Sequence, residues 1–300
     1  MGDSLRNLWL LALLALFWGS SNPMIKMAVE TIGPATVAAG RIATACLAFV
    51  IIAAVRGLPL LSTARSARAW RDMVPIAALA YVFPPLLIAY GQRHIDSGLT
   101  AITVGLVPIF TAFLSITVYR RERFEIWTGA GIAIGFTGLI MLLGMASLGE
   151  TRELAGLVAV AGGAFSYAWS NMAMARASRH DPIVSSALVL VAASAVLVPF
   201  AAAMDAPWPV APSELSLAAT LALGLITTGC GSYVFFVLAA RTGPIYLSTV
   251  NYLTPVVGVA LGAAALGEAL EWSAFGALAC ILAGVAATTY GRTRSKNLNP

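Results

Sequence analysis

Charged residues are scarce in this chain. Only 10% of its 300 residues are Asp, Glu, Lys or Arg, whereas 59% are hydrophobic. Soluble domains usually carry about 25% charged residues, because charged side chains make up much of a water-facing surface. The shortage excludes an ordinary soluble domain and predicts a protein that crosses a membrane many times.

Histidine and cysteine are also rare. The two histidines, His94 and His180, fall in loops on opposite sides of the expected membrane, and the three cysteines, Cys46, Cys230 and Cys280, fall inside apolar runs. Their spacing matches neither a zinc site nor a disulfide framework. The chain also lacks the G-x-x-x-x-G-K-[ST] loop of ATP-driven pumps. We therefore expect no metal, no cofactor and no enzymatic activity.

Long apolar runs, in contrast, fill most of the chain. A hydrocarbon core about 30 Å thick takes roughly 20 helical residues to cross. Runs of that length, separated by charge or by Pro and Gly, predict ten transmembrane helices at 8–29, 35–56, 73–91, 97–119, 125–146, 154–176, 183–204, 214–239, 244–267 and 272–290. The runs do not alternate apolar and polar residues as barrel strands do, so we expect an all-α integral membrane protein.

Lys and Arg are distributed unevenly between alternate loops. Arg93 and Arg152 fall on one side, and Lys26 and Arg41 lie within spans. The other fourteen share the opposite side: Arg6, Arg56, Arg65, Arg68, Arg71, Arg120, Arg121, Arg123, Arg176, Arg179, Arg241, Arg292, Arg294 and Lys296. Cytoplasmic loops are enriched in these residues, so both termini are expected in the cytoplasm. The excess of Lys and Arg over Asp and Glu therefore requires no nucleic-acid partner.

The chain contains an internal repeat. Residues 105–143 resemble residues 251–288 at an offset near 146, and the matched pairs are Pro108 with Pro255, Glu122 with Glu268, Glu125 with Glu271 and Gly138 with Gly284. The motif LFWGSSN also aligns with FSYAWSN, which pairs Trp18 with Tyr167, Ser21 with Ser170 and Asn22 with Asn171.

Each repeat holds five expected spans, in residues 1–147 and 148–291, before a tail at 292–300. Because five is odd, the second repeat must enter the membrane in the opposite sense to the first. Inverted repeats, with a substrate site near the midplane, are a recurring plan of secondary transporters. The repeat therefore predicts transport.

These features resemble the EamA type of the drug/metabolite transporter superfamily. The resemblance rests on two five-span units, the Pro-to-Glu pattern in 97–119 and 244–267, Arg41 early in the second span, and Trp18-x-x-x-Asn22 in the first. Within that group the chain is similar to bacterial amino-acid exporters of the YddG kind. The resemblance implies a multi-pass protein of the cell inner membrane. It also implies a central cavity lined mainly by spans 1, 3, 4, 6, 8 and 9, with spans 5 and 10 outside it.

Polar and aromatic residues inside the spans are the candidates for substrate binding, because an unpaired polar group is costly in hydrocarbon. Trp18 and Asn22 are four residues apart, hence on one helix face, and Tyr167 and Asn171 repeat that spacing. The expected substrate-binding residues are Trp18, Asn22, Tyr81, Thr103, Tyr167, Asn171, Tyr246, Asn251 and Tyr252. The alternative is that Asn22 and Asn171 only join neighbouring helices.

Six further residues are expected to serve structure or gating: Ser21, Pro23, Arg41, Tyr90, Pro108 and Pro255. Pro23 removes a helical hydrogen bond near Gly19. Arg41 lies roughly two turns inside its span and needs partners, either backbone carbonyls or a carboxylate. We expect a structural role for it rather than a substrate role. Tyr90, near the outer mouth, fits an interfacial anchor or a gate.

Spans 5 and 10 carry small residues at helical spacing, Gly131-x-x-x-Gly135 and Gly276-x-x-x-Cys280-x-x-x-Gly284. Such seams let helices pack closely, so these spans are expected to be scaffold helices. A monomer and a homodimer both fit the sequence.

The kind of substrate follows from the expected lining. A sugar-phosphate carrier should show several cationic residues in its cavity, and only Lys26 and Arg41 are candidates. An aromatic, hydroxyl and amide lining favours export of amino acids, aromatic and other neutral ones. All thirteen carboxylates fall in loops or at span ends, which favours facilitated flux over proton antiport. An exporter of other small metabolites or drugs, and a non-transporting scaffold or receptor, are the alternatives.

Overall fold

The computed structural model describes residues 2–118, 126–147, 151–174, 181–205, 211–235, 237–238, 241, 250–269 and 271–298. This part of the chain is helical and contains no strand. Its elements are α1 Gly2–Gly19, α2 Ser21–Val29, α3 Pro34–Val55, α4 Leu60–Ala64, α5 Ala67–Ile76, the π-helix η1 Ala77–Val82, α6 Phe83–Gly91, α7 Ser97–Val104, α8 Val107–Thr117, α9 Ile126–Ser147, α10 Thr151–Met174, α11 Pro182–Met204, α12 Glu214–Ala222, the π-helix η3 Leu223–Cys230, α14 Val250–Leu266 and α15 Trp272–Leu298.

Seven helical segments of the described chain are long and apolar enough to cross a membrane: Leu5–Val29, Pro34–Val55, Ala67–Gly91, Ser97–Thr117, Pro182–Met204, Glu214–Phe235 and Trp272–Gly291. Two shorter apolar segments are Ile126–Leu142 and Val250–Leu266. The prediction of an all-α, multi-pass membrane protein is confirmed. The finer prediction of ten crossings in two inverted repeats stays a prediction.

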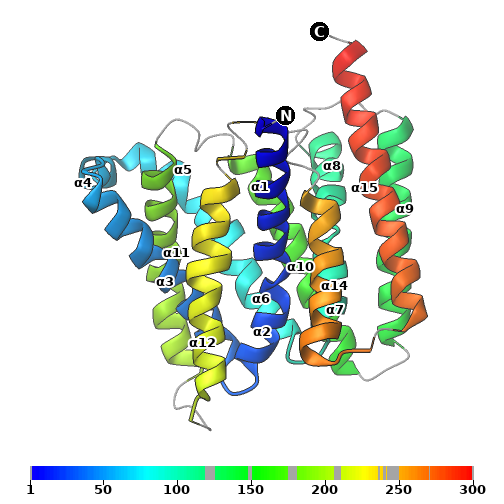
Figure 1. Cartoon of the computed structure of the whole chain (residues 1–300), viewed down its shortest axis with the longest axis horizontal. Helices are drawn as coiled ribbons and strands as arrows, with labels where there is room; N and C mark the ends of the chain where they lie inside the picture. Colours follow the sequence, from blue (N-terminus) through cyan, green and yellow to red (C-terminus); the bar gives the residue numbers. More distant parts are fainter. Residues whose placement is uncertain are drawn as a thin grey trace.

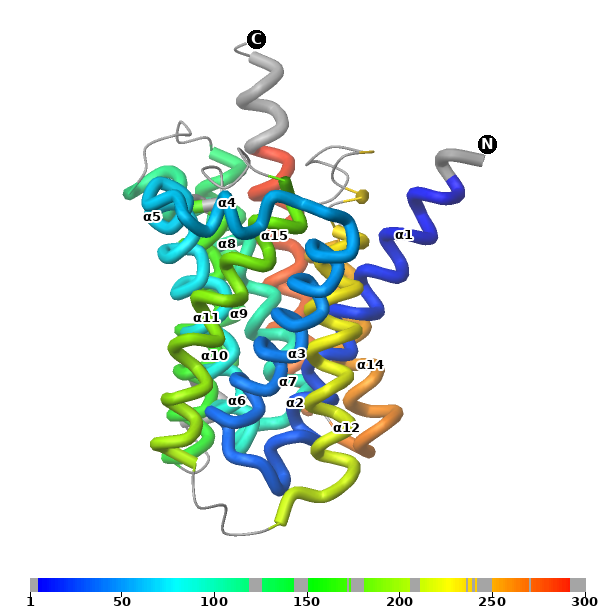
Figure 2. The backbone as a smooth tube through the Cα atoms, turned by 90° about the vertical axis from the view of Figure 1, so that its left-hand side faces the viewer, coloured from blue at the N-terminus to red at the C-terminus, as the bar shows by residue number. Residues whose placement is uncertain are grey.

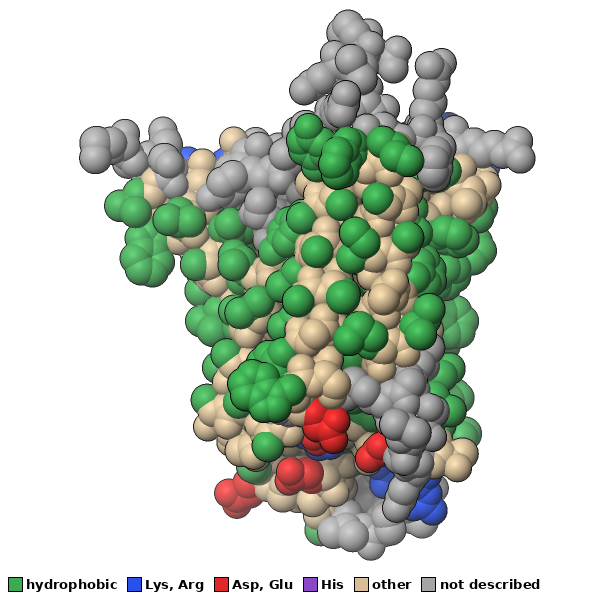
Figure 3. Space-filling model, turned by 90° about the vertical axis from the view of Figure 1, so that its right-hand side faces the viewer, with side chains coloured by type: hydrophobic (Ala, Val, Ile, Leu, Met, Phe, Trp, Pro, Cys, Tyr) green, Lys and Arg blue, Asp and Glu red, His purple; other side chains and the backbone are tan. Residues whose placement is uncertain are grey.

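The helices stand side by side in one bundle (Figure 1). Helices α3, α4 and α11 lie at one edge, and α9 and α15 lie at the other. The start of α1, the end of α15 and the short helix α4 lie at the same end of the bundle, as Figure 2 shows from a second side. On the side of α9 and α15, hydrophobic and uncharged side chains cover most of the height, and acidic and basic side chains gather toward the end opposite the C-terminus (Figure 3). This distribution suits a protein surrounded by lipid.

Four of the expected spans are not regular α-helices. The first is interrupted at Ser20, three residues before Pro23, and the fourth is interrupted at Gly105 and Leu106, just before Pro108. The third and eighth spans each contain a π-helical segment, η1 and η3. Breaks and π-helical turns free backbone groups and turn the following side chains to a new direction, and they often occur at functional sites.

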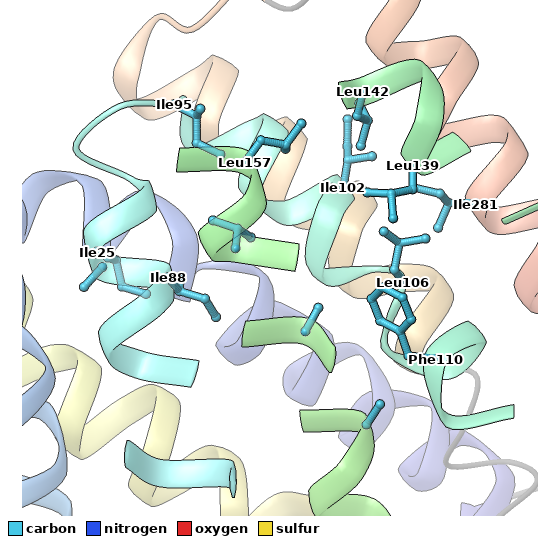
Figure 4. Close-up of a cluster of buried hydrophobic side chains, with 14 of the residues drawn as sticks. Ile25, Ile88, Ile95, Ile102, Leu106, Phe110, Leu139, Leu142, Leu157 and Ile281 are labelled. Atoms are coloured by element: carbon cyan, nitrogen blue, oxygen red, sulfur yellow. The ribbon is translucent and has the colours of Figure 1, made fainter. Parts of the chain in front are cut away.

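Two large clusters of buried apolar residues hold the bundle together. The first joins α2, α6 to α10 and α15, and Figure 4 shows Ile25 near Ile88 and Leu139 near Ile281 in this cluster. The second joins α3, α5, η1 and α11. Tyr167 of α10 packs against both clusters. Residues around Tyr167 therefore lie between the two halves of the core.

The predicted small-residue seam joins α9 to α15. A Cβ atom at Gly131 would lie 2.6 Å from both the Gly284 carbonyl oxygen and the Thr288 amide nitrogen. A Cβ atom at Gly138 would lie 3.3 Å from the Cβ atom of Cys280. Only glycine allows backbones to approach this closely. The scaffold role expected for these two helices agrees with their position at the edge of the bundle (Figure 1).

At the start of two helices, carboxylates from distant parts of the chain accept hydrogen bonds. Glu268 accepts hydrogen bonds from the Ser97 amide at 2.8 Å, the Ser97 hydroxyl at 2.7 Å and the Gly98 amide at 3.0 Å, at the start of α7. Asp205 accepts one of 2.6 Å from the Thr36 amide, at the start of α3. Carboxylates satisfy the free N–H groups at a helix start and complement its positive dipole end. These contacts tie the first and second parts of the chain together at the end opposite the termini.

Candidate functional site

Arg41 of α3 makes hydrogen bonds to side chains of two other helices. Its Nε atom donates a 2.7 Å hydrogen bond to the Thr228 hydroxyl of η3, and its Nη1 atom donates a 3.3 Å bond to the Ser21 hydroxyl of α2. The expected partners were backbone carbonyls or a carboxylate, and this expectation is wrong. Side-chain hydroxyls take their place, because both neighbouring helices present a Ser or Thr at this level.

Two tyrosines complete the cluster around Arg41. The Tyr81 hydroxyl, on η1, lies near Ser232 and within electrostatic range of Arg41 and Tyr167. The Tyr167 hydroxyl, on α10, also interacts with Arg41. Both tyrosines pack against core residues, yet each keeps part of its surface accessible. The structure thus brings together three residues of the sequence prediction, Arg41, Tyr81 and Tyr167, from three different spans.

Trp18 and Asn22 face different neighbours. The Trp18 ring lies 5.5 Å from the ring of Phe235, and its Nε1 atom lies 2.9 Å from where a Cβ atom at Gly231 would be. Asn22 is buried, and its Oδ1 atom accepts a hydrogen bond of 3.5 Å from Gln92. The interruption at Ser20 lies between the two residues, so the four-residue spacing does not give them a common set of contacts.

Several other expected binding residues are engaged elsewhere. The Thr103 hydroxyl is fully buried and donates to the Leu99 carbonyl of its own helix. The Tyr252 hydroxyl donates to Thr289 of α15 at 3.1 Å, and the Asn171 amide donates to Thr111 of α8 at 3.2 Å.

Asn251 is half-buried in the first turn of α14. Tyr246 lies outside the described residues. The roles of Asn251 and Tyr246 stay predictions.

The three prolines expected to serve structure or gating lie in the first turn of a helix or inside one. Pro23 is buried just after the interruption at Ser20, Pro108 lies in the first turn of α8, and Pro255 is buried inside α14. A Cβ atom at Gly105 would lie 3.0 Å from Pro255, so the break in the fourth span faces α14. Tyr90 is 46% exposed, which suits an interfacial anchor.

Three polar residues of the interior were missed from the sequence. Thr228 and Ser232 belong to the run TTGCGS at 227–232, whose small polar residues inside an apolar span were the available signal. Gln92 is fully buried, and its Oε1 atom has no hydrogen-bond partner among the described residues. Tyr233, the residue after Ser232, is 56% exposed.

A groove of about 390 Å³ lies between α3 and α11. Its lining consists of Thr36, Ala39, Gly40, Ala43, Val198, Ala201 and Ala202. This lining offers almost no polar group that could orient a small molecule. The cluster around Arg41, with its cation, hydroxyls and aromatic rings, is the better candidate for a binding site.

The chain is similar to known proteins over most of its length. The model of the EamA-like transporter family matches residues 5–144 and again residues 154–290. The chain belongs to the EamA-like transporter family. The resemblance predicted from the sequence is therefore confirmed, and the protein is a membrane transporter of this family.

The EamA relatives are similar over most of their length. The uncharacterized inner membrane transporter YedA of Escherichia coli K12 is 28% identical over 89% of this chain and 87% of its own. The "Probable terminal-alkyne amino-acid exporter" of Streptantibioticus cattleyicolor is 26% identical over 88% and 86%. The "Probable amino-acid metabolite efflux pump" of Salmonella typhimurium is 23% identical over 94% of each chain.

A crystal structure shows the same fold as this EamA protein. The two superpose with a TM-score of 0.68 over 98% of this chain and 99% of the other, at 18% sequence identity. At that identity the similarity speaks for the fold alone.

Proposed function

We propose that this EamA protein exports amino acids, aromatic and other neutral ones favoured, by alternating access of a central site. The cluster of Arg41, Tyr81 and Tyr167 carries the proposal. It combines a cation, hydroxyls and two aromatic rings between the two core clusters. A zwitterion with an apolar side chain is complementary to such a lining. Two of the relatives described above are named for amino-acid export or efflux.

An inverted repeat of two five-helix units, 1–147 and 148–291, would supply the alternating motion. The family model matches twice, once in each unit. The two π-helices begin at Ala77 and Leu223, an interval of 146 residues that equals the offset of the sequence repeat. Two copies of one helical unit that pack against each other can rock about a site at their interface.

We place the protein in the cell inner membrane with both termini in the cytoplasm. The start of α1 and the end of α15 lie at the same end of the bundle (Figure 1). Arg65, Arg68 and Arg71 follow or belong to the short helices α4 and α5 at that end, whereas Arg93 follows α6 at the opposite end. This arrangement agrees with the positive-inside rule.

Facilitated flux without a dedicated proton site is the proposed mechanism. Asp72 is the carboxylate that most needs testing, since it is buried in α5, within the candidate span Ala67–Gly91. Asp72 lies near the end of the span that faces the same side as the two termini. Arg41 and Tyr167 belong to other spans, and Tyr81 lies further along the same span, in η1. We therefore assign Asp72 no part in coupling.

Two alternatives of different kinds are distinguished by one measurement. The purified protein in liposomes is loaded with unlabelled phenylalanine or threonine, and counterflow of the labelled amino acid is followed. Accelerated uptake over protein-free liposomes supports the proposal. If ethidium exchanges and no amino acid does, the protein exports drugs; if nothing in a broad panel of metabolites exchanges, a scaffold or receptor role replaces transport.

A further inference from the structure

Arg41 is a cation that has no carboxylate partner among the described residues. Its two hydrogen bonds go to the neutral hydroxyls of Thr228 and Ser21. Among the residues that the structure describes, no Asp or Glu lies within ion-pairing distance of it. Ionised groups inside a membrane bundle normally pair with an opposite charge or line a watery pathway. Hydroxyl dipoles solvate the guanidinium but leave its positive charge uncompensated.

The guanidinium also has donors to spare. It carries five N–H groups in a planar fork that matches a carboxylate. The bonds to Thr228 and Ser21 use two of the five, and the other three have no partner among the residues that the structure describes. The hydroxyls thus hold Arg41 in place without filling its hydrogen-bonding capacity.

Two aromatic residues lie in the neighbourhood of Arg41. Tyr81 and Tyr167 pack against the same core cluster, lie within electrostatic range of Arg41 and keep part of their surface accessible. A molecule whose anionic end met Arg41 would place its apolar body against the two rings. The ring faces also favour a nearby cation, such as an ammonium group.

We propose that Arg41 binds the carboxylate of the transported molecule. This inference rests on the proposed function and deepens it, because it names the group that every substrate must carry. The substrate class is then small carboxylates with an apolar body, amino acids included, and decarboxylated amines are excluded. Arg41 is a substrate-binding residue in this proposal, in addition to the structural role expected from the sequence.

A set of phenylalanine analogues tests the proposal on the unaltered protein. Purified protein in detergent is titrated with phenylalanine, with 3-phenylpropionate, which lacks the amino group, and with phenethylamine, which lacks the carboxylate, while thermal stabilisation is measured. We expect both carboxylates to bind and phenethylamine to bind at least about tenfold more weakly, as loss of a charge-assisted hydrogen bond predicts. Equal binding of phenethylamine would overturn the proposal.

Variants of Arg41 provide the second measurement. Arg41→Gln should abolish the preference for carboxylates over phenethylamine, whereas Arg41→Lys, which keeps the charge but not the fork, should retain part of it. Thr44→Val is the control and should behave as wild type, because the Thr44 hydroxyl, one turn along α3, bonds within the described chain only to the Gly40 carbonyl. A full carboxylate preference in a folded Arg41→Gln protein would contradict the proposal. If this variant does not fold, the analogue series alone decides.

The outcomes separate this inference from the proposed function. Counterflow of phenylalanine that is competed equally well by phenethylamine would leave amino-acid transport standing and remove Arg41 as the carboxylate site. Conversely, arylcarboxylate binding that depends on Arg41, without counterflow of any amino acid, would support the site and refute amino-acid export.

Discussion

The Nε atom of Arg41 in α3 lies 2.7 Å from the hydroxyl oxygen of Thr228 in η3, although 187 positions separate the two residues in sequence. This hydrogen bond connects the second expected span to the eighth at the level of the candidate site. Together with the Nη1 bond to Ser21, it holds the guanidinium and leaves three donors without a partner among the described residues.

Thr228→Val should weaken both the fold and transport. The change keeps the side-chain shape and removes the acceptor of the Arg41 bond, and hydrogen bonds to charged groups contribute about 1.5–3 kcal/mol. Thr227→Val is the matched control, because the Thr227 hydroxyl, also in η3, donates to the Leu223 carbonyl one turn back and to no other described residue. Thermal unfolding in detergent and the initial rate of phenylalanine counterflow should both fall for Thr228→Val alone. Equal losses for the two variants would show that the hydrogen bond to Arg41 makes no specific contribution to stability or transport.

Glu268→Gln should destabilise the start of α7. Glu268 accepts three hydrogen bonds from Ser97 and Gly98, and a neutral amide loses one acceptor oxygen and the favourable interaction with the helix dipole. Losing a helix cap typically costs about 0.5–2 kcal/mol. Glu271→Gln, three residues on, should have little effect, since the Glu271 carboxylate accepts one hydrogen bond, from the Ser273 hydroxyl, among the described residues. Thermal unfolding of both variants checks this, and similar midpoints would argue against the cap.

Gly131→Ala should disrupt the seam between α9 and α15. The new methyl group would lie 2.6 Å from backbone atoms of Gly284 and Thr288, which cannot move without separating the helices. Gly162→Ala is the control, because its nearest neighbour would lie 3.6 Å away. The control should be neutral or gain up to about 1 kcal/mol from better helix propensity. The measurement is the fraction of folded protein after graded heating, and unchanged stability of Gly131→Ala would show that α15 can shift.

Neutral amino-acid flux should persist when the pH gradient across the vesicle is collapsed. Asp72→Asn should transport at close to the wild-type rate, because the proposed mechanism gives this buried carboxylate no proton to carry. The checks are net efflux with and without an ionophore that dissipates the gradient. Efflux that stops in the wild type and becomes insensitive to pH in Asp72→Asn would identify a proton site.

Single cysteines at the two ends of the bundle should report the orientation. In a chain whose native Cys46, Cys230 and Cys280 are replaced, Ser62→Cys in α4 should react with a membrane-impermeant thiol reagent only after cells are opened. Arg93→Cys, at the opposite end, should react in intact cells; both positions are exposed. The reverse pattern would invert the orientation.

The sequence by itself determined the class of this protein. The length and hydropathy of a run decide whether it crosses a bilayer, and both are local properties that need no partner. The same holds for the two small-residue seams that contain Gly131 and Gly284, since small residues at four-residue spacing mark a close helix contact wherever the partner lies. Arg41, too, was recognised as a buried group in need of partners from its position alone.

Only the tertiary structure decided which polar groups meet. The interruption at Ser20 lies between Trp18 and Asn22, and they contact Phe235 and Gln92 respectively. The π-helical segment η3 turns Thr228 toward Arg41, a pairing that no spacing within span 2 or span 8 could predict. Periodicity assumes a regular helix and describes one segment at a time, so it fails where a break or a π-helical turn shifts the face and where the partner comes from a distant segment.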